Sequence, residues 1–316
     1  MYAAIVTGAT GQDGSYLSEL LVTKGYDVKC LVRKDIQSEH VKYYVGDILN
    51  YSDVYTIISD CSKYDRIEIY NLAAKVHNGS PLETFEVNTM GIHYILQAVT
   101  ELNIKDKCRI CQASSSEMFG NTLEVPQNEN TPFNPRNIYG VSKVSAHLLM
   151  KYYREYQGMY TCSGILYNHE SPRRTDLYVT QKVIQGLKSG QCFSIGNLDV
   201  RRDWGHAKDY VEALWLMLQQ EQPDDYVVAT GTTYSVRDII ELTATKLNQH
   251  VVWSGQGVDE IGTINGKVMI RVSKEFYRPY DTHLLVGDPT KIQIIGWSRT
   301  HDIHSIIDDM LNTLNK

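Results

Sequence analysis

The sequence lacks any apolar run long enough to cross a lipid bilayer, and its first residues, Met1-Tyr2-Ala3, show no signal peptide. It also lacks an excess of positive charge, since 31 lysines and arginines face 37 aspartates and glutamates, a net charge of −6. Internal repeats and low-complexity segments are absent as well. We therefore expect no membrane partner and no nucleic-acid partner, and an anionic ligand would need a local cluster of cations.

Cysteine is scarce, with six residues scattered mostly through apolar, strand-like runs at positions 30, 61, 108, 111, 162 and 192. Cys108 and Cys111 match the CxxC spacing of redox and metal sites, but two residues three apart on a strand point to opposite faces. We interpret them as core residues, because free cysteine is usually buried. The pattern predicts a reduced, cytoplasmic protein with neither a disulfide framework nor a metal site.

Hydrophobic residues make up 42% of the 316-residue chain, which suits one large α/β domain and a smaller one. Strand-like and helix-like stretches alternate as far as Tyr167, which predicts a doubly wound parallel sheet of the Rossmann type. We predict a first domain of residues 1–167 with about 202–231, and a smaller α/β domain of about 168–201 with 232–316. The predicted strands are 3–7, 27–33, 42–47, 67–74 and 108–113, and the predicted helices are 15–24, 82–102, 139–156, 207–220, 235–248 and 303–314.

A glycine-rich turn follows the first predicted strand, with the sequence Gly8-Ala9-Thr10-Gly11-Gln12-Asp13-Gly14. Strand, glycine turn and helix form the dinucleotide-binding arrangement, in which the glycines make a tight turn, admit a pyrophosphate and let the helix pack on the strand. The spacing is GxxGxxG rather than GxGxxG. An ordinary turn between strand and helix is the alternative, and the matching site downstream leads us to favour the dinucleotide.

The end of the second predicted strand bears on the choice between NAD and NADP. An NAD enzyme usually has an acid there for the ribose 2′-hydroxyl, whereas this chain has Arg33 and Lys34 before Asp35. Two cations suit a 2′-phosphate, so we predict NADP, and the alternative is a solvated surface pair. Asp47 and Ile48 end the third strand beside the predicted adenine site. The fourth strand ends in small or apolar residues that can pass under the cofactor, namely Leu72, Ala73 and Ala74.

The fifth predicted strand runs into Ser114-Ser115-Ser116-Glu117, and a predicted helix then carries Tyr139 and Lys143. Four residues apart on a helix, Tyr139 and Lys143 share one face. A lysine ammonium beside a phenol lowers the phenol pKa from about 10, which gives a base for a sugar hydroxyl. A serine at the strand end can hydrogen-bond the same hydroxyl. A YxxxK match alone is weak, but with the serines and the glycine turn it is strong.

Several cations are spread over the later, more polar part of the sequence. If they converge in the fold, they form a pocket for a diphosphate. Exposed charges that only aid solubility are the alternative. The positions are Arg174, Lys182, Arg201, Arg202 and Arg278.

Taken together, the motifs resemble those of the extended short-chain dehydrogenases/reductases, and specifically the GDP-mannose 4,6-dehydratase family. The similar stretches span nearly the whole chain, and those at 168–174 and 202–213 are specific to that family. They are GATGQDGSYL (8–17), NLAA (71–74), QASSSEMFG (112–120), PFNPRNIYGVSK (132–143), NHESPRR (168–174), GNLDVRRDWGHAKDYVEA (196–213) and RPYDTHLLVGD (278–288).

The resemblance implies a role for each matching residue. Ser115 falls at the family's catalytic threonine, and Glu117, Tyr139 and Lys143 fall at its base, its tyrosine and its lysine. His169 falls where the family contacts NADP, and Arg174 where it contacts the cofactor or the neighbouring phosphates. The positions implied for substrate are Ser116, Asn168, Arg174, Lys182, Asn197, Arg202, Arg278 and Asp281.

The chain departs from the family pattern at four places. Asp281 stands where the family usually has glutamate, and Phe85 stands near a usual cofactor-contacting tyrosine. The segment after Lys34, which helps the family form tetramers, is much shorter than usual. The stretch between Lys182 and Gly196 is also shorter. By resemblance, the long helices at 82–102 and 139–156 predict a homodimer, with a tetramer held open.

The resemblance implies a dehydratase that retains NADP, acts on GDP-mannose and makes a 4-keto-6-deoxy sugar nucleotide. Glu117 would remove the C5 proton after oxidation at C4. The sister dTDP-glucose dehydratases place aspartate directly before this glutamate. Here Ser116 stands there, which leaves Glu117 to serve as both base and acid. The alternatives are a GDP-sugar epimerase or reductase of the same fold, and a non-catalytic NADP-binding or scaffold subunit.

Overall fold

The computed structural model describes residues 1–76, 79–277 and 284–313. Its main feature is a seven-stranded, wholly parallel sheet with the strand order β10-β6-β5-β4-β1-β2-β3. The doubly wound parallel sheet predicted from the sequence is thus confirmed. The strands are β1 (Tyr2–Thr7), β2 (Asp27–Val32), β3 (Val41–Val45), β4 (Arg66–Asn71), β5 (Cys108–Ser115), β6 (Tyr160–Leu166) and β10 (Tyr226–Val228).

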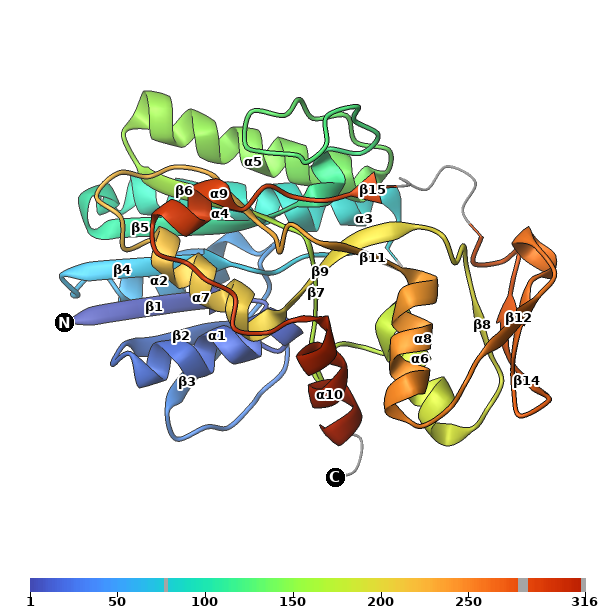
Figure 1. Cartoon of the computed structure of the whole chain (residues 1–316). Helices are drawn as coiled ribbons and strands as arrows, with labels where there is room; N and C mark the ends of the chain where they lie inside the picture. Colours follow the sequence, from blue (N-terminus) through green and yellow to red (C-terminus); the bar gives the residue numbers. More distant parts are fainter. Residues whose placement is uncertain (77–78, 278–283, 314–316) are drawn as a thin grey trace.

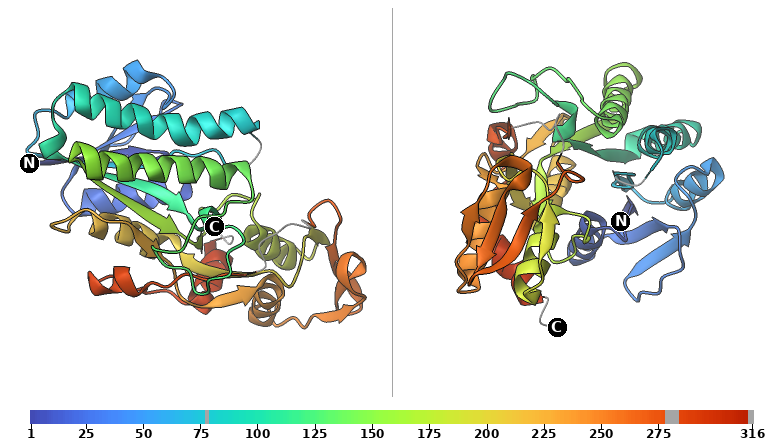
Figure 2. Two further views of the ribbon diagram at one scale, coloured as in Figure 1. Left: turned by 90° about the horizontal axis from the view of Figure 1, so that it is seen from above. Right: turned by 90° about the vertical axis from the view of Figure 1, so that its right-hand side faces the viewer.

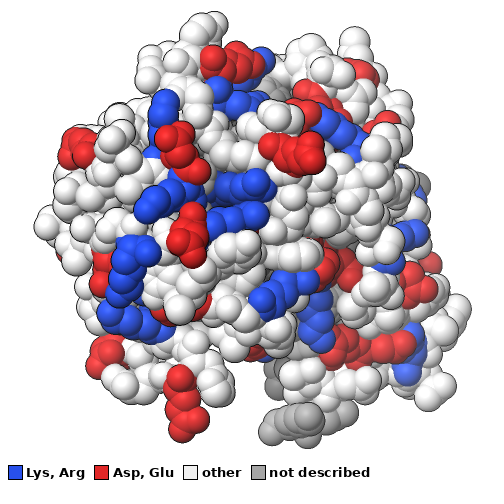
Figure 3. All heavy atoms as spheres, turned by 90° about the vertical axis from the view of Figure 1, so that its left-hand side faces the viewer, with Lys and Arg blue, Asp and Glu red and all other residues white. Residues whose placement is uncertain are grey.

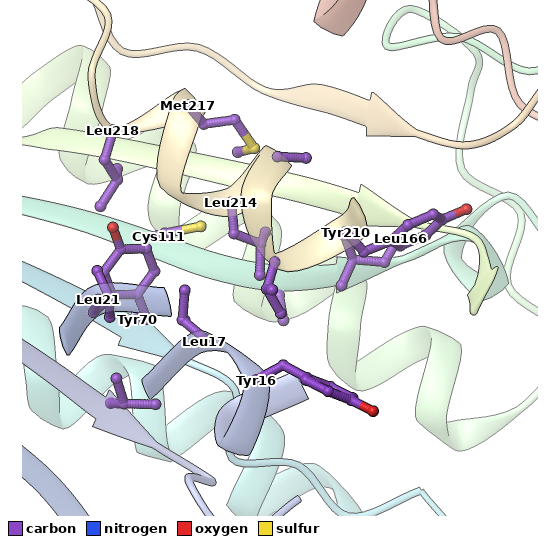
Figure 4. Packing of buried hydrophobic residues seen from close by; sticks show 14 of the residues in the cluster. Tyr16, Leu17, Leu21, Tyr70, Cys111, Leu166, Tyr210, Leu214, Met217 and Leu218 are labelled. Atoms are coloured by element: carbon purple, nitrogen blue, oxygen red, sulfur yellow. The ribbon is translucent and has the colours of Figure 1, made fainter. Parts of the chain in front are cut away.

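Helices cover both faces of this sheet (Figure 1). One layer contains α1 (Gln12–Thr23), α7 (Ala207–Met217) and α9 (Thr290–Ile294), and the other contains α2 (Tyr51–Asp60), α4 (Gly91–Glu101) and α5 (Ile138–Gln157). In the first layer, α1 and α7 bury Leu17, Leu21, Leu214 and Met217 completely against the strands (Figure 4). Each such leucine contributes about 2 kcal/mol by leaving water. This packing fixes the start of α1 relative to the end of β1.

Helix α5 is held at both ends by its own sequence. The Asn137 side chain accepts a hydrogen bond from the Gly140 backbone nitrogen at 2.8 Å, and Gly158 ends the helix with φ +63°. Lys143, Ala146 and Met150 are buried. Their spacing of three and four residues places them on one face of the helix.

The single helix predicted over 82–102 is interrupted in the structure, so that prediction is wrong in detail. It consists of α3 (Pro81–Phe85), a π-helical turn at Glu86–Met90 and then α4. The turn contains buried Asn88. The Asn88 side chain accepts a hydrogen bond from the Lys75 backbone nitrogen and donates to the Lys75 carbonyl oxygen, and it also donates to Ser142 Oγ at 2.9 Å. Helices α4 and α5 lie side by side on one face of the molecule (Figure 2).

The later part of the chain builds two small sheets and three helices around a separate core. One sheet contains β7 (Asn168–Glu170), β9 (Arg201–His206), β11 (Thr233–Ser235) and β15 (Leu284–Leu285), and the other contains β8 (Phe193–Ile195), β12 (Val252–Ser254), β13 (Ile261–Ile264) and β14 (Lys267–Val272). The helices are α6 (Val179–Ser189), α8 (Val236–Lys246) and α10 (Ile303–Thr313). Short 3₁₀ turns occur at Lys105–Lys107, Ser116–Met118 and Gly257–Asp259.

All six cysteines are free thiols, five of them buried, so the interpretation of Cys108 and Cys111 as core residues is confirmed. No helix in the described ranges is both long and apolar enough to span a bilayer. On the face shown in Figure 3, lysine and arginine side chains are interspersed with aspartate and glutamate. That face therefore presents no continuous cationic surface.

Candidate active site

The candidate site lies at the carboxyl ends of β1, β4 and β5. The order of the large sheet reverses there, since β2 and β3 extend to one side of β1 and β4 to β6 extend to the other. Open parallel sheets bind ligands at such a switch point. The ends of these strands and the first two turns of α5 carry the predicted catalytic residues Ser115, Glu117, Tyr139 and Lys143.

Two of the three glycines in the turn after β1 are required by the packing of the protein itself. Gly8 has φ +69°, and a Cβ there would lie 2.7 Å from the Ala73 backbone nitrogen; at Gly14 it would lie 2.3 Å from the Gly8 carbonyl oxygen. Gly11 is exposed, and its Cβ would meet nothing nearer than 3.3 Å. Gly11 also begins α1 without a side-chain cap. The open glycine and the uncapped turn fit a pyrophosphate, which a helix N-terminus attracts.

Asp13, in the first turn of α1, pairs with His169 of β7. The imidazole Nε2 lies 3.0 and 2.9 Å from the two carboxylate oxygens, and Nδ1 lies 2.7 Å from the Tyr167 carbonyl oxygen. The imidazole therefore bridges Asp13 of α1 and the backbone of Tyr167. Burial raises the pKa of Asp13, but His169 and Arg174 more than offset this and lower the pKa below its usual range. Gln12 closes the group by donating to the His169 carbonyl oxygen at 3.1 Å.

Ser115, Tyr139 and Lys143 come together as predicted, although their electrostatics differ from the prediction. The hydroxyls of Ser115 and Tyr139 are hydrogen-bonded. Lys143 Nζ donates to the Ala113 carbonyl oxygen at 2.7 Å and lies 5.6 Å from the centroid of the Tyr139 ring. Burial raises the pKa of Tyr139, and the Ser115 hydrogen bond and Arg174 lower it only in part, so the predicted lowering of this pKa is wrong in this structure. Burial lowers the pKa of Lys143 to about 8.

Glu117 stands at the mouth of the site, half-buried, in the short turn that follows β5. Its backbone nitrogen donates to Ser115 Oγ at 3.2 Å, and its Oε2 accepts from Asn137 Nδ2 at 2.9 Å. Ser116 is buried beside it. Ser114 Oγ is buried and has no hydrogen-bond partner in the described part of the chain. The site therefore has the Glu117 carboxylate two residues after Ser115 at the end of β5, and Ser115 is the residue that pairs with Tyr139 of α5.

The residues predicted to bind the rest of the dinucleotide follow the neighbouring strands. Arg33 and Lys34 come after β2 and are exposed. Asp47 comes after β3, is exposed, and accepts a hydrogen bond from the Leu49 nitrogen at 2.9 Å, while Ile48 is buried. Thr10 is exposed in the glycine turn after β1. The three residues after β4 are Leu72, Ala73 and Ala74, and β4 is the neighbour of β1 in the sheet.

The predicted substrate residues fall into two groups. Arg174 lies near Asp13 and Tyr139, since its charge lowers the pKa of each against the effect of burial. Lys182 Nζ lies 3.9 Å from the centroid of the Phe276 ring, and Gly196, next to Asn197, also approaches Phe276. The remaining described members are buried Ser116 in the turn after β5, Asn168 in β7 and buried Arg202 in β9. The predictions for Arg278 and Asp281 lie outside the described residues.

Sequence reasoning missed several residues that shape the site. Asn137 positions both α5 and Glu117, and an asparagine just before a helix is a signal that could have revealed it. Tyr210 is buried against His169, with ring centroids 4.5 Å apart. Tyr178 stacks on the Arg174 guanidinium. No sequence pattern marks Tyr178 or Tyr210, because their contacts depend on how distant elements pack.

A doubly wound parallel sheet, a glycine turn after its first strand and a Tyr–Lys pair beside strand-end serines define the extended short-chain dehydrogenase/reductase class. Solved structures of this class share the fold at low identity. A dTDP-glucose 4,6-dehydratase from Bacillus anthracis in complex with NAD has a TM-score of 0.82 at 17% identity, covering 100% of this chain and 97% of that one. A UDP-glucose 4-epimerase with UDP-glucose from Thermotoga maritima has a TM-score of 0.83 at 18% identity, covering 99% and 100%.

The chain belongs to the GDP-mannose 4,6-dehydratase family, whose model matches residues 5–310. It is 40% identical to the GDP-mannose 4,6-dehydratase of Vibrio cholerae, across 98% of this chain and 92% of that protein. The Drosophila melanogaster enzyme is 40% identical, with coverage of 98% and 85%. The human enzyme is 38% identical, with coverage of 98% and 90%.

Proposed function

We propose that this chain is an NADP-dependent GDP-mannose 4,6-dehydratase, which converts GDP-D-mannose to GDP-4-keto-6-deoxy-D-mannose with loss of water. Membership of the family supports the proposal, and the observation that carries it is the position of Glu117. Oxidation and reduction at one carbon need only the tyrosine and lysine, whereas elimination needs a base for the neighbouring carbon. Glu117, held by Asn137 beside the Ser115–Tyr139 pair, supplies that base.

Each catalytic residue has one task in this proposal. Tyr139 takes the proton from the O4 hydroxyl, to which Ser115 donates a hydrogen bond, and Lys143, whose Nζ lies 5.6 Å from the centroid of the Tyr139 ring, is the cation placed to offset the burial that raises the pKa of Tyr139. When bound, NADP would supply the redox chemistry, as the hydride acceptor for C4 and the hydride donor for C6.

Glu117 then works on the keto sugar. It removes the C5 proton, which the C4 carbonyl has made acidic. The electrons of the C5–H bond form the C5–C6 double bond as the C6–O bond breaks. Glu117 returns its proton to the departing hydroxyl, so that one water molecule leaves. When hydride is added at C6, C5 takes up the proton that Tyr139 accepted from O4, which restores the phenolate for the next turnover.

The remaining residues hold the two nucleotides. The turn around the cofactor pyrophosphate consists of Gly8, Thr10, Gly11, Gln12 and Gly14. The contact between Asp13 and His169 holds this turn against β7. Arg33 and Lys34 meet the 2′-phosphate, while the adenine and the remaining backbone contacts are made by Asp47, Ile48, Leu72, Ala73 and Ala74. The substrate is held by Ser116, Asn168, Lys182, Asn197, Arg202, Arg278 and Asp281, and Arg174 contacts the cofactor or the neighbouring phosphates.

We infer the two-domain division as predicted, with residues 1–167 and about 202–231 binding NADP and the rest binding the sugar nucleotide. We also infer a homodimer through α4 and α5, which lie side by side with Leu148, Tyr152 and Tyr156 exposed on α5. The shortened segment after Lys34 leaves a tetramer open. The five buried free thiols support a cytoplasmic location.

The test separates the two chemical tasks. Tyr139→Phe removes the phenol that acts on O4, so no reduced cofactor should form on the enzyme. Glu117→Gln keeps the size of the side chain but cannot accept the C5 proton, so cofactor reduction should persist while dehydration slows by about 10²–10⁴-fold. Absorbance of the reduced cofactor after one turnover, with mass spectrometry of the sugar nucleotide, reads both steps.

Two matched controls accompany these variants. Tyr156→Phe alters an exposed tyrosine on the same helix, and Glu124→Gln alters an exposed glutamate in the loop after the site. Both should dehydrate GDP-mannose at the wild-type rate. If Glu117→Gln also does so, the dehydratase proposal fails and an epimerase or reductase replaces it.

A further inference from the structure

Glu170 is a buried acid next to the site that the proposed reaction does not use. It ends β7 and is 1% exposed. Its Oε2 accepts a hydrogen bond from Thr180 Oγ1 of α6 at 2.6 Å and lies 3.3 Å from the Nε of Arg174. Its Oε1 is buried with no hydrogen-bond partner in the described ranges. A buried carboxylate is unfavourable unless a charge compensates it, and Arg174 is the cation that does so.

Arg174 is fixed on three sides. Glu170 lies against its Nε edge, and the ring of Tyr178 lies against its flat face, with the guanidinium carbon 3.4 Å from the ring centroid. Its backbone is pinned as well, because its nitrogen donates to the Ser171 carbonyl oxygen at 3.0 Å and its carbonyl oxygen accepts from Gln181 Nε2 at 2.9 Å. Nε is in ion-pair contact with Glu170 but makes no hydrogen bond within the described residues, and the two terminal nitrogens make none there either.

The Arg174 guanidinium lies close enough to the candidate active site for its charge to act there. Its charge contributes to lowering the pKa of Asp13 in the glycine turn, and it also acts on Tyr139. A guanidinium edge with two parallel N–H groups matches two oxygens of a phosphate. Arg174 can bind a phosphate in this way only if the protein leaves the edge with the two terminal nitrogens open to the ligand.

We propose that Glu170 is a positioning residue that selects the open edge of Arg174. By occupying the Nε side, Glu170 presents the two terminal nitrogens to a diphosphate ester lying between the glycine turn and Tyr139. Tyr178 fixes the plane of the guanidinium, and Glu170 fixes its rotation within that plane. The inference rests on the proposed function, which places two diphosphates at the site, one in NADP and one in GDP-mannose.

Glu170 also connects β7 to α6 through Thr180, and that contact could matter for stability alone. A double-mutant cycle separates the two roles. The variants are Glu170→Gln, Arg174→Gln and the pair together, with Thr180→Val as the matched control that removes only the hydroxyl donor. Kd is measured for NADPH by fluorescence and for GDP by calorimetry, and thermal unfolding is recorded for each variant.

Glu170→Gln should raise the Kd of one diphosphate ligand about tenfold or more, as for loss of a hydrogen bond to a charged group. Arg174→Gln should raise the same Kd, and the pair should bind no more weakly than Arg174→Gln alone. Thr180→Val should lower the unfolding temperature yet keep Kd within about twofold. The ligand whose Kd changes, NADPH or GDP, identifies the diphosphate that Arg174 holds.

Two results would overturn the inference without touching the proposed function. One is wild-type binding of both ligands by Glu170→Gln. The other is an effect of Glu170→Gln that adds in full to that of Arg174→Gln. A wild-type protein that binds neither NADPH nor GDP would overturn the proposed function, and this inference with it.

Discussion

Replacing His206 by asparagine should remove a large part of the acid sensitivity of the fold. His206 is fully buried where β9 meets α7. Its Nδ1 accepts from the Lys208 backbone nitrogen at 3.1 Å, and its Nε2 lies 3.1 Å from Asp309 Oδ2 on α10. The ring stacks on His301 with centroids 4.1 Å apart, and His301 Nδ1 lies 2.9 Å from Asp209. A neutral ring that donates from Nε2 satisfies every contact, whereas a charged ring loses the acceptor for Lys208.

The size of the effect follows from the shift in protonation. Burial, helped by His301, lowers the pKa of His206 to about 4, against the opposing carboxylates of Asp309 and Asp209. In the unfolded chain the pKa is about 6.5. Since the folded value is the lower one, the unfolded state binds the proton first as the pH falls, and stability is lost between about 6.5 and 4. Between pH 7 and pH 5 this site alone should remove about 2 kcal/mol of unfolding free energy.

Urea denaturation followed by far-ultraviolet circular dichroism at pH 7 and pH 5 measures this directly. Asparagine keeps an oxygen acceptor for the first turn of α7 but does not titrate, so His206→Asn should lose about 2 kcal/mol less than wild type between the two pH values. The matched control His304→Asn alters an exposed histidine on α10 and should behave as wild type. Equal losses in wild type and His206→Asn would refute the reasoning.

Three further outcomes are expected. Gly14→Ala should destabilise the protein by about 3 kcal/mol in urea, because its Cβ would lie 2.3 Å from the Gly8 carbonyl oxygen, whereas Gly25→Ala, with nothing within 4 Å, should lose only about 1 kcal/mol for its backbone angle. Arg33→Asp should reduce or reverse a wild-type preference for NADP over NAD in fluorescence titrations, and a wild type that prefers NAD would contradict the assignment. Light scattering should give a dimer, and a monomer would refute the proposed use of α4 and α5.

Local patterns in the sequence predict the large sheet well. Short apolar runs between polar helices, with Gly8 and Gly14 at the first turn, are compatible with few folds other than a doubly wound parallel sheet. The serines at the end of β5 could be placed in the site because carboxyl ends of parallel strands meet at one edge, and Tyr139 and Lys143 could be placed on one face of a helix by their spacing. These inferences depend on spacing along the chain, which the sequence carries directly.

Features that depend on packing between distant elements were not predictable. The π-helical turn at Glu86–Met90 contains Asn88, which donates a hydrogen bond to Ser142 of α5, a distant helix in the sequence. Burial is the largest influence on the pKa of Tyr139 and raises it, and residues from other elements, such as Ser115 and Arg174, act on it as well. The ion pair of Glu170 with Arg174 needs the strand, the loop and α6 in place before its geometry exists.

The most direct test of the central claim is to incubate the purified wild-type protein with GDP-mannose in heavy water and analyse the sugar nucleotide by mass spectrometry. The proposed mechanism predicts a product that has lost one water molecule and carries solvent deuterium at C5, formed without net consumption of NADPH. GDP-mannose recovered unchanged, an isomer of equal mass, or a product that forms only as NADPH is consumed would contradict it.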